Sequence, residues 1–154
     1  MTIITGYRVY RGQSNSNVGM STTYMQQETI IRKNGCRTPP QEMFMVDLQS
    51  FIEGKISEGH EILLNLDTNE EWDMDGSRIH EMAMEVNLYD IAKEINPNGV
   101  PATYTRANSS TRIDFMLGSK NVLNNVTAFG MASEEYGLIL GKHRAQYIDI
   151  NIEE

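Results

Sequence analysis

The feature that most constrains the fold is a short, mostly apolar segment at residues 60–66, which ends directly before Asp67. A run of this length and composition predicts a strand that is covered on both faces. The preceding segment predicts a helix over residues 40–58, which Pro39 and Pro40 open and Gly59 ends. Its apolar side chains fall on one stripe, made of Phe44, Leu48, Phe51, Ile52 and Ile56.

The rest of the chain predicts further strands and helices in alternation. Strands are expected at residues 2–10, 102–106, 111–118 and 144–152, and a loop is expected at residues 11–21. Helices are expected from Thr22 or Thr23 to Lys33 and over residues 77–87, the second one capped by Ser77. Residues 87–91 either continue this second helix or begin a short further piece. The predicted fold class is therefore α/β or α+β.

Composition sets bounds on the class of protein. The chain has 154 residues, enough for one domain, and no apolar run approaches the ~18 residues of a membrane-spanning helix. Cys36 is the single cysteine and residues 1–7 do not resemble a signal peptide, so we expect an intracellular, reducing compartment. The net charge of −8 argues against broad binding to a phosphate backbone. A bound metal ion would still allow action on phosphates, because the ion supplies positive charge.

The first candidate functional site is the pair Asp67 and Asn69, at the end of the strand over residues 60–66. Residues two apart point to the same side of an extended chain, and the carboxyl ends of strands in open α/β sheets usually border the ligand cleft. Asp67 could bind a divalent cation or orient a water, and Asn69 could hold a phosphate oxygen or that same water. The alternative is structural, an Asx turn that caps the next segment.

Two further residues are candidates for the same kind of site. Asp114 interrupts an apolar strand, so it either faces inward and needs a partner or lies on the solvent-facing side. His143 precedes the last predicted strand, where it is either an ordinary surface residue or the partner of a carboxylate. Such a carboxylate would fix the tautomer of the imidazole and stabilise its protonated form. The pattern alone leaves these alternatives open.

Taken in order, these segments resemble the endonuclease/exonuclease/phosphatase superfamily, which has the DNase I-like fold. Leu64–Glu70 resembles its "GDFN" box, Thr111–Ser119 its "RIDYIL" box, Lys142–Arg144 its terminal "SDHRP" box, and Ile3–Val9 its "VTAYxP" strand. The resemblance covers essentially the whole chain and is closest to the endonuclease domains beside reverse transcriptases in mobile elements. It implies that residues 1–154 form a single partial domain. This would be the C-terminal half of a four-layer α/β/β/α sandwich, with a mixed sheet and helices on one face.

The resemblance also implies a role for each matching residue. Asp67 would position or deprotonate the attacking water, and Asn69 would hold that water or a phosphate oxygen. His143 would contact the scissile phosphate, with Asp114 orienting its ring, and Tyr7 would touch the phosphate. Mg²⁺ is the implied cofactor if the chain is active, because phosphoester hydrolysis needs an aligned water and stabilisation of negative charge.

Two departures from the family pattern leave open whether the chain is an enzyme. The family's metal-binding Glu and an Asn belong to a first half that has no counterpart in residues 1–154. The family's terminal box has Asp before the His, whereas this chain has Lys142, whose ammonium would repel a cation. Glu70 or Glu71 could supply a substitute ligand. We therefore expect an incomplete active site and weak or no activity of the chain alone.

Two hypotheses about function follow. The first is a fragment or subunit of a Mg²⁺-dependent nuclease or phosphodiesterase. The second is a co-opted module, a structural or binding subunit of a larger complex that has lost catalysis. Half a sandwich would expose a broad apolar sheet face, so we expect a homodimer or a larger protein complex to cover it. Nucleic acid is a weaker expectation as a partner, given the net charge of −8.

Overall fold

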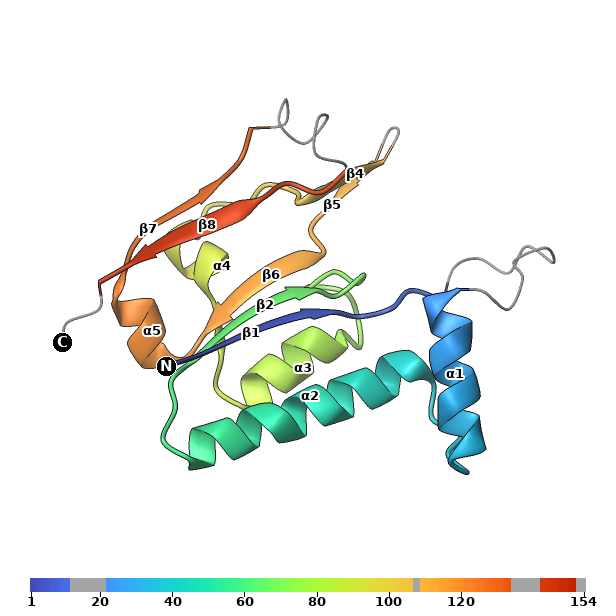
Figure 1. Cartoon of the computed structure of the whole chain (residues 1–154). Helices are drawn as coiled ribbons and strands as arrows, with labels where there is room; N and C mark the ends of the chain where they lie inside the picture. Colours follow the sequence, from blue (N-terminus) through green and yellow to red (C-terminus); the bar gives the residue numbers. More distant parts are fainter. Residues whose placement is uncertain (12–21, 107–108, 134–141, 152–154) are drawn as a thin grey trace.

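A mixed four-stranded sheet forms the centre of the computed structural model, which describes residues 1–11, 22–106, 109–133 and 142–151 (Figure 1). The order of its strands is β1-β2-β6-β3. Their bounds are Thr2–Tyr7 for β1, Ile62–Asp67 for β2, Asp114–Gly118 for β6 and Tyr89–Asp90 for β3. β1 and β2 are parallel, and β6 is antiparallel to both of its neighbours. The sheet is therefore mixed, as the family resemblance implies.

Two antiparallel strand pairs accompany this sheet. One pairs β4 (Tyr104–Arg106) with β5 (Ser109–Thr111), and the other pairs β7 (Val126–Met131) with β8 (Gln146–Ile150). In Figure 1 the β7–β8 pair lies over the face of the central sheet that is opposite helices α2 and α3. The β4–β5 pair lies near the end of the sheet at which β6 begins.

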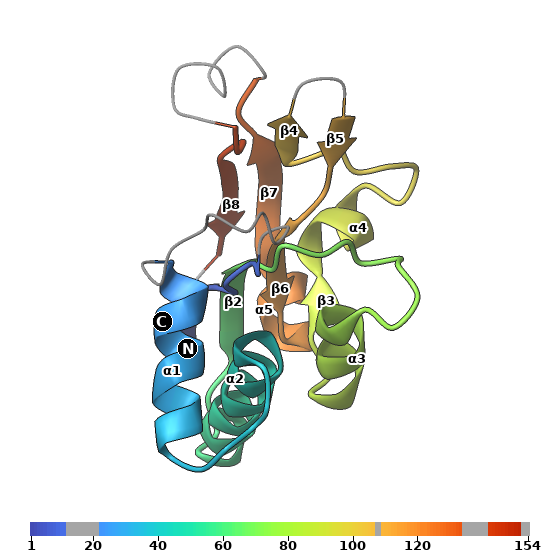
Figure 2. The ribbon, with the colours of Figure 1, turned by 90° about the vertical axis from the view of Figure 1, so that its right-hand side faces the viewer.

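Two helices cover one face of the central sheet. They are α2 (Pro40–Ser57) and α3 (Arg78–Glu85), and α1 (Thr23–Lys33) lies beside α2 (Figure 2). Thr22 caps α1 and Ser77 caps α3, each through a side-chain oxygen that accepts a backbone N–H. The two remaining helices are the short α4 (Ile91–Ile95) and α5 (Lys120–Asn124). None of the helices in the described part is both long and apolar enough to cross a membrane.

The main hydrophobic core lies between these helices and the sheet. Ile52 of α2, Ile79 of α3 and Leu64 of β2 are all fully buried there. A second cluster, on the opposite face, joins the sheet to the β7–β8 pair and includes Leu63 and Met116. β2 therefore has apolar contacts on both faces, as its sequence predicts.

The stripe predicted for α2 is partly wrong. Leu48 and Ile52 are buried, but Phe51 and Ile56 are 50% and 41% exposed. Met45 takes a core position instead, at 3% exposure. The buried side of the helix is narrower than the predicted stripe. α2 contacts the sheet, α3 and α1, and the side that carries Phe51 and Ile56 faces solvent. The predicted face of α3, by contrast, is buried as expected at Ile79, Met82, Ala83 and Val86.

Several predicted element bounds also need correction. The first strand ends at Tyr7 rather than residue 10, and the segment 111–118 contains a break between β5 and β6. Residues 87–91 do not extend α3 but include β3 and the start of α4. β7 and α5 were not predicted at all. Most of the loop predicted at 11–21 lies outside the described residues.

Truncation of two neighbouring residues of α2 tests the corrected stripe. We expect Ile52→Ala to lower the free energy of unfolding by about 2–5 kcal/mol, because it removes a fully buried side chain. Phe51→Ala should cost roughly 0.5 kcal/mol or less, because that ring is half exposed. Urea denaturation followed by circular dichroism gives both values. Equal losses at the two positions would contradict this orientation of the helix.

Candidate active site

The register of the central sheet brings three predicted site residues into one row. Tyr7 at the end of β1 lies opposite Asp67 of β2, which in turn lies opposite Asp114 of β6. Residues that pair across neighbouring strands point to the same face of a sheet. The row therefore lies on one face, at the end of the sheet where the parallel strands β1 and β2 have their carboxyl ends.

His143 joins this row from the segment that precedes β8. Its Nδ1 atom lies 3.0 Å from Asp114 Oδ2 and 3.1 Å from Asp114 Oδ1. The ring of Tyr104 packs against the imidazole with 4.8 Å between ring centroids, and the same two residues form a backbone bridge. Because Nδ1 faces the carboxylate, Nε2 is the imidazole nitrogen available to a ligand. The structure thus pairs Asp114 with His143, whereas the sequence alone also allowed each of them to be a solvent-facing residue without such a partner.

The turn after β2 combines the two alternatives that the sequence left open for Asp67 and Asn69. The backbone N–H of Asn69 donates to Asp67 Oδ1 over 3.2 Å, so the Asx turn is present. Asn69 has a φ of 52°, in the left-handed region that Asn tolerates better than most residues. Its Nδ2 donates to the Arg8 carbonyl over 2.8 Å, and its Oδ1 is left to accept from a ligand. The turn also forms part of a cleft wall.

Glu70 belongs to a buried structural network. Its Oε2 forms an ion pair with the guanidinium of Arg8, and its Oε1 accepts the backbone N–H of Ile79 over 2.7 Å. One carboxylate oxygen is thus engaged by Arg8 and the other at the start of α3, and Glu70 lies outside the group of candidate metal ligands, so its role as a substitute ligand stays a prediction. Glu71 is exposed and lines the cleft.

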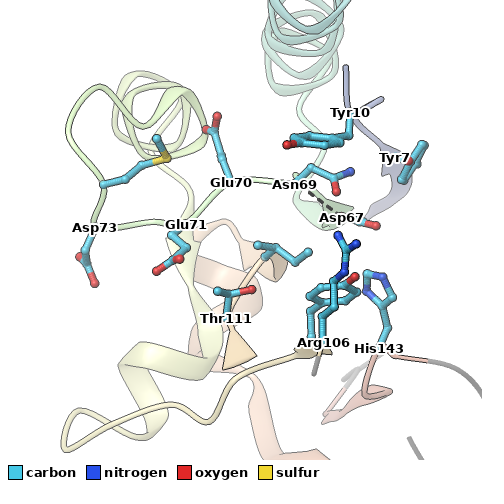
Figure 3. A pocket seen from close by; sticks show the side chains of 13 residues that line it. Tyr7, Tyr10, Asp67, Asn69, Glu70, Glu71, Asp73, Arg106, Thr111 and His143 are labelled. Carbon is cyan, nitrogen blue, oxygen red and sulfur yellow. Dashed lines mark hydrogen bonds between the residues drawn. The ribbon is translucent and has the colours of Figure 1, made fainter. Parts of the chain in front are cut away.

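The site residues border a cleft with a volume of about 680 Å³ (Figure 3). Tyr7, Asp67, Asn69 and His143 line it together. Several other residues that line the cleft were not predicted from the sequence, among them Tyr10, Asp73, Tyr104, Arg106 and Thr111. A weak signal was present for two of these, because Tyr104 and Arg106 are two apart on a predicted strand and so share a side of it.

The electrostatics of the row are dominated by its two carboxylates. Partial burial raises the pKa of Asp67, and the neighbouring charge of Asp114 raises it further. The N–H of Asn69 and the imidazole of His143 oppose this shift. The net rise shows that the site holds the ionised form of Asp67 at a cost in free energy, which makes that carboxylate a stronger base.

The row also provides a donor set that suits a divalent cation. Asp67, Asp114 and His143 each offer one ligand atom, and these atoms all lie within 4.8 Å of one another. Carboxylate oxygens suit Mg²⁺ and Mn²⁺, whereas an imidazole nitrogen suits transition metals such as Zn²⁺. The residues present therefore fit a metal ion, although no third carboxylate joins them among the described residues.

Lys142 directly precedes His143, where the resembling family has Asp. Its carbonyl accepts the N–H of Thr105 over 3.0 Å, which attaches this segment to β4. Its side chain is exposed. The backbone of Lys142 thus helps to place His143.

Comparisons with solved structures identify the fold. The chain is similar to the 3′ phosphatase NExo from Neisseria, whose solved structure contains a product DNA hairpin. The two share 14% sequence identity and superpose with a TM-score of 0.63, over 75% of this chain and 56% of NExo. The chain is equally similar to the 3′–5′ exonuclease NExo of Neisseria meningitidis, at 15% identity, a TM-score of 0.63, and the same 75% and 56% coverage. The catalytic domain of Xenopus laevis APE2 matches at 16% identity and a TM-score of 0.50, over 72% of this chain and 45% of that domain.

The chain has the DNase I-like fold. It spans about half the length of these solved structures, 56% of NExo and 45% of the APE2 domain. No family model matches the sequence, and no curated protein matches it. The predicted fold class is therefore confirmed, with the DNase I-like fold present over a part of the length that it has in the neighbours.

The pKa shift of Asp67 predicts a pH-dependent effect on stability. We expect Asp67→Asn to raise the thermal midpoint at neutral pH, because it removes the cost of an ionised, partly buried carboxylate. Because the pKa of Asp67 is raised in the folded state, the protonated carboxyl group contributes its full stabilisation below pH 3.8, the ordinary pKa of an aspartate. This stabilisation is lost as the pH rises through the folded-state pKa. The gain from the substitution should accordingly disappear in acid. Scanning calorimetry at several pH values measures it.

The exposed carboxylate of Asp47 on α2 provides the control, because Asp47→Asn should leave the thermal midpoint nearly unchanged at each pH. A lower midpoint of Asp67→Asn at neutral pH would show that the ionised carboxylate stabilises the fold, contrary to the expected sign.

Proposed function

We propose that this chain is a phosphoester hydrolase module of the endonuclease/exonuclease/phosphatase superfamily. The observation that supports this most strongly is the convergence of Asp67, Asp114 and His143 within 4.8 Å, where Asp67 and His143 line the cleft with Tyr7 and Asn69 and Asp114 lies behind them. These are the five residues that the motif order selects. That same order favours the branch found beside reverse transcriptases in mobile elements.

The chemistry assigns each side chain a step in hydrolysis. The Asp67 carboxylate positions the attacking water and takes its proton. Asn69 Oδ1 orients that water. Nε2 of His143 donates to a non-bridging phosphate oxygen, and Asp114 at 3.0 Å fixes the tautomer and stabilises the protonated ring. The hydroxyl of Tyr7 contacts another phosphate oxygen.

A divalent ion, Mg²⁺ or Mn²⁺, is the cofactor that we propose. Asp67 and Asp114 would hold it, and it would stabilise the negative charge that develops on the phosphate. Lys142 weakens this binding by repulsion. We therefore propose that affinity for the ion is low and that hydrolysis by this chain alone is slow.

The proposed substrate is a phosphoester at the end of a DNA strand. NExo is described as a 3′ phosphatase and a 3′–5′ exonuclease, both of which act at strand ends. The cleft wall includes the acidic residues Glu71 and Asp73 beside Arg106. Such a wall would repel a long phosphate backbone but accept one or two phosphates, which favours an end over the interior of a duplex.

Hydrolysis of a 3′-phosphorylated DNA hairpin in Mg²⁺ or Mn²⁺ tests this function. We expect slow, metal-dependent release of phosphate that falls by about 10²–10⁴-fold in Asp67→Ala, the range that a positioned acid–base group contributes. Asp47→Ala, which removes an exposed carboxylate from α2, should leave the rate unchanged. The folded protein releasing no phosphate at any concentration of either metal would contradict the proposal.

Reversal of the charge at Lys142 offers a gain-of-function test. We expect Lys142→Asp to lower the Mg²⁺ concentration needed for half-maximal rate by roughly tenfold, the factor that corresponds to about 1.4 kcal/mol of altered charge interaction. Lys142→Asn separates loss of the ammonium from gain of a carboxylate, and it should have a smaller effect. If neither substitution changes the metal dependence, Lys142 has no influence on the ion.

A second candidate function, a non-catalytic structural subunit, is favoured by the edge strand β1. β1 pairs only with β2 among the described residues, and its sequence TIITGY has no charged residue or proline. Ile3 and Tyr7 are 60% and 55% exposed on it. Proteins usually guard an exposed edge with charge or proline, because an unguarded edge pairs with another strand. We propose that a second copy of this chain pairs with β1 across a two-fold axis.

Light scattering of the purified protein tests this association. We expect a dimer, and we expect Ile3→Lys to give a monomer because it places a charge on the edge. Ile30→Lys is the matched control, since Ile30 is also 60% exposed but lies on α1, and it should leave the dimer intact. A wild-type monomer at high protein concentration, or a dimer that survives in Ile3→Lys, would reject pairing through β1.

A further inference from the structure

Two buried threonine hydroxyls lie directly behind the candidate active site. Thr68 and Thr103 are both fully buried, and neither lines the cleft. Thr68 separates Asp67 from Asn69, and Thr103 precedes the aromatic residue that packs on His143. A buried hydroxyl is costly unless it is hydrogen-bonded, so the partners of these two side chains indicate what they hold in place.

Thr103 connects the segment of Asp114 to the segment of His143. Its Oγ1 accepts two consecutive backbone N–H groups, from Ile113 over 3.1 Å and from Asp114 over 3.0 Å. Its carbonyl accepts the N–H of Arg144 over 2.7 Å. One residue therefore fixes the main chain at Asp114 through its side chain, and the main chain next to His143 through its backbone.

Thr68 holds the same stretch from the other side. Its N–H donates to the Ile113 carbonyl over 2.9 Å, and its hydroxyl lies 2.9 Å from that carbonyl and 2.8 Å from the Glu70 carbonyl. The peptide groups around Ile113 are thus fixed by Thr68 on one side and Thr103 on the other. The segments that carry Asp67, Asp114 and His143 therefore meet at this point, although they are far apart in sequence.

We propose that Thr103 is a positioning residue for the Asp114–His143 pair, an inference that rests on the proposed hydrolytic function. It touches no substrate and acts through the backbone. A single oxygen accepts both N–H groups, so removing it leaves two buried donors without a partner at once. The chain at Asp114 must then shift to find other acceptors, and the carboxylate moves relative to His143 Nδ1. Displacements of about 1 Å at a catalytic group can lower a rate about 100-fold.

The test compares Thr103→Val, which has nearly the same shape without the hydroxyl, with Thr103→Ser, which keeps the oxygen. We expect kcat to fall about 100-fold in Thr103→Val with KM little changed, and to recover to within a few-fold in Thr103→Ser. Thr127→Val is the matched control. Thr127 also makes a hydroxyl–backbone hydrogen bond, to the Asp149 carbonyl over 3.2 Å, but it lies on β7 away from the cleft.

A second readout does not depend on activity. The long-range ¹H–¹⁵N NMR spectrum of the His143 ring reports its tautomer and the hydrogen bond at Nδ1. We expect Thr103→Val to give the ring signals of Asp114→Asn, and Thr103→Ser to give those of the wild type. Ile52→Val, a core substitution in α2, shows what loss of stability alone does, and it should leave the ring signals unchanged.

Several outcomes would overturn the role of Thr103. Unchanged ring signals and kcat in Thr103→Val would do so, as would a Thr103→Ser variant that behaves like Thr103→Val. If Thr103→Val does not fold, hydrogen exchange of the wild type decides, because fast exchange of the Ile113 and Asp114 amides would exclude the two bonds to Thr103. A wild type without hydrolysis but with the expected ring signals would refute the proposed function and leave the positioning role supported.

Discussion

Two carboxylates lie opposite each other where β2 pairs with β6, and the rest of the site depends on how their repulsion is offset. Asp67 and Asp114 are brought together by strand register, which the buried apolar side chains of both strands fix. His143 compensates Asp114 from one side at 3.0 Å. Burial raises the pKa of Asp67, the charge of Asp114 raises it further, and His143 offsets only part of that rise. A site that stores such a cost is typical of function rather than of stability.

The acidity of the whole chain gives this imbalance a chemical meaning. A protein with a net charge of −8 repels phosphates at long range, and the wall of the cleft carries Glu71 and Asp73 besides Asp67. Arg106 contributes a positive side chain to the cleft wall. A divalent ion between the carboxylates would reverse the local field and allow a phosphate to approach.

Sequence patterns predicted much of the fold and the members of the site, but not how the site is supported. The buried strand β2 and the capped helix α3 followed from local composition. β7 was missed because its sequence VTAFGM alternates only weakly between apolar and polar residues and contains a glycine. Asp114 and His143 are 29 residues apart, so only the family motif order brought them together. Nothing local marks Thr103, whose hydroxyl meets backbone groups 10 and 11 residues away.

Paramagnetic relaxation by Mn²⁺ measures most directly whether the row of carboxylates is a metal-dependent centre, and it needs no substrate. With substoichiometric Mn²⁺, the NMR signals of Asp67, Asn69, Asp114 and His143 should broaden first. Signals from α2 should persist, and Asp67→Asn should abolish the selective broadening. Selective broadening at another acidic surface, with the four site residues unaffected, would contradict the placement of the ion and with it the hydrolytic function proposed for this chain.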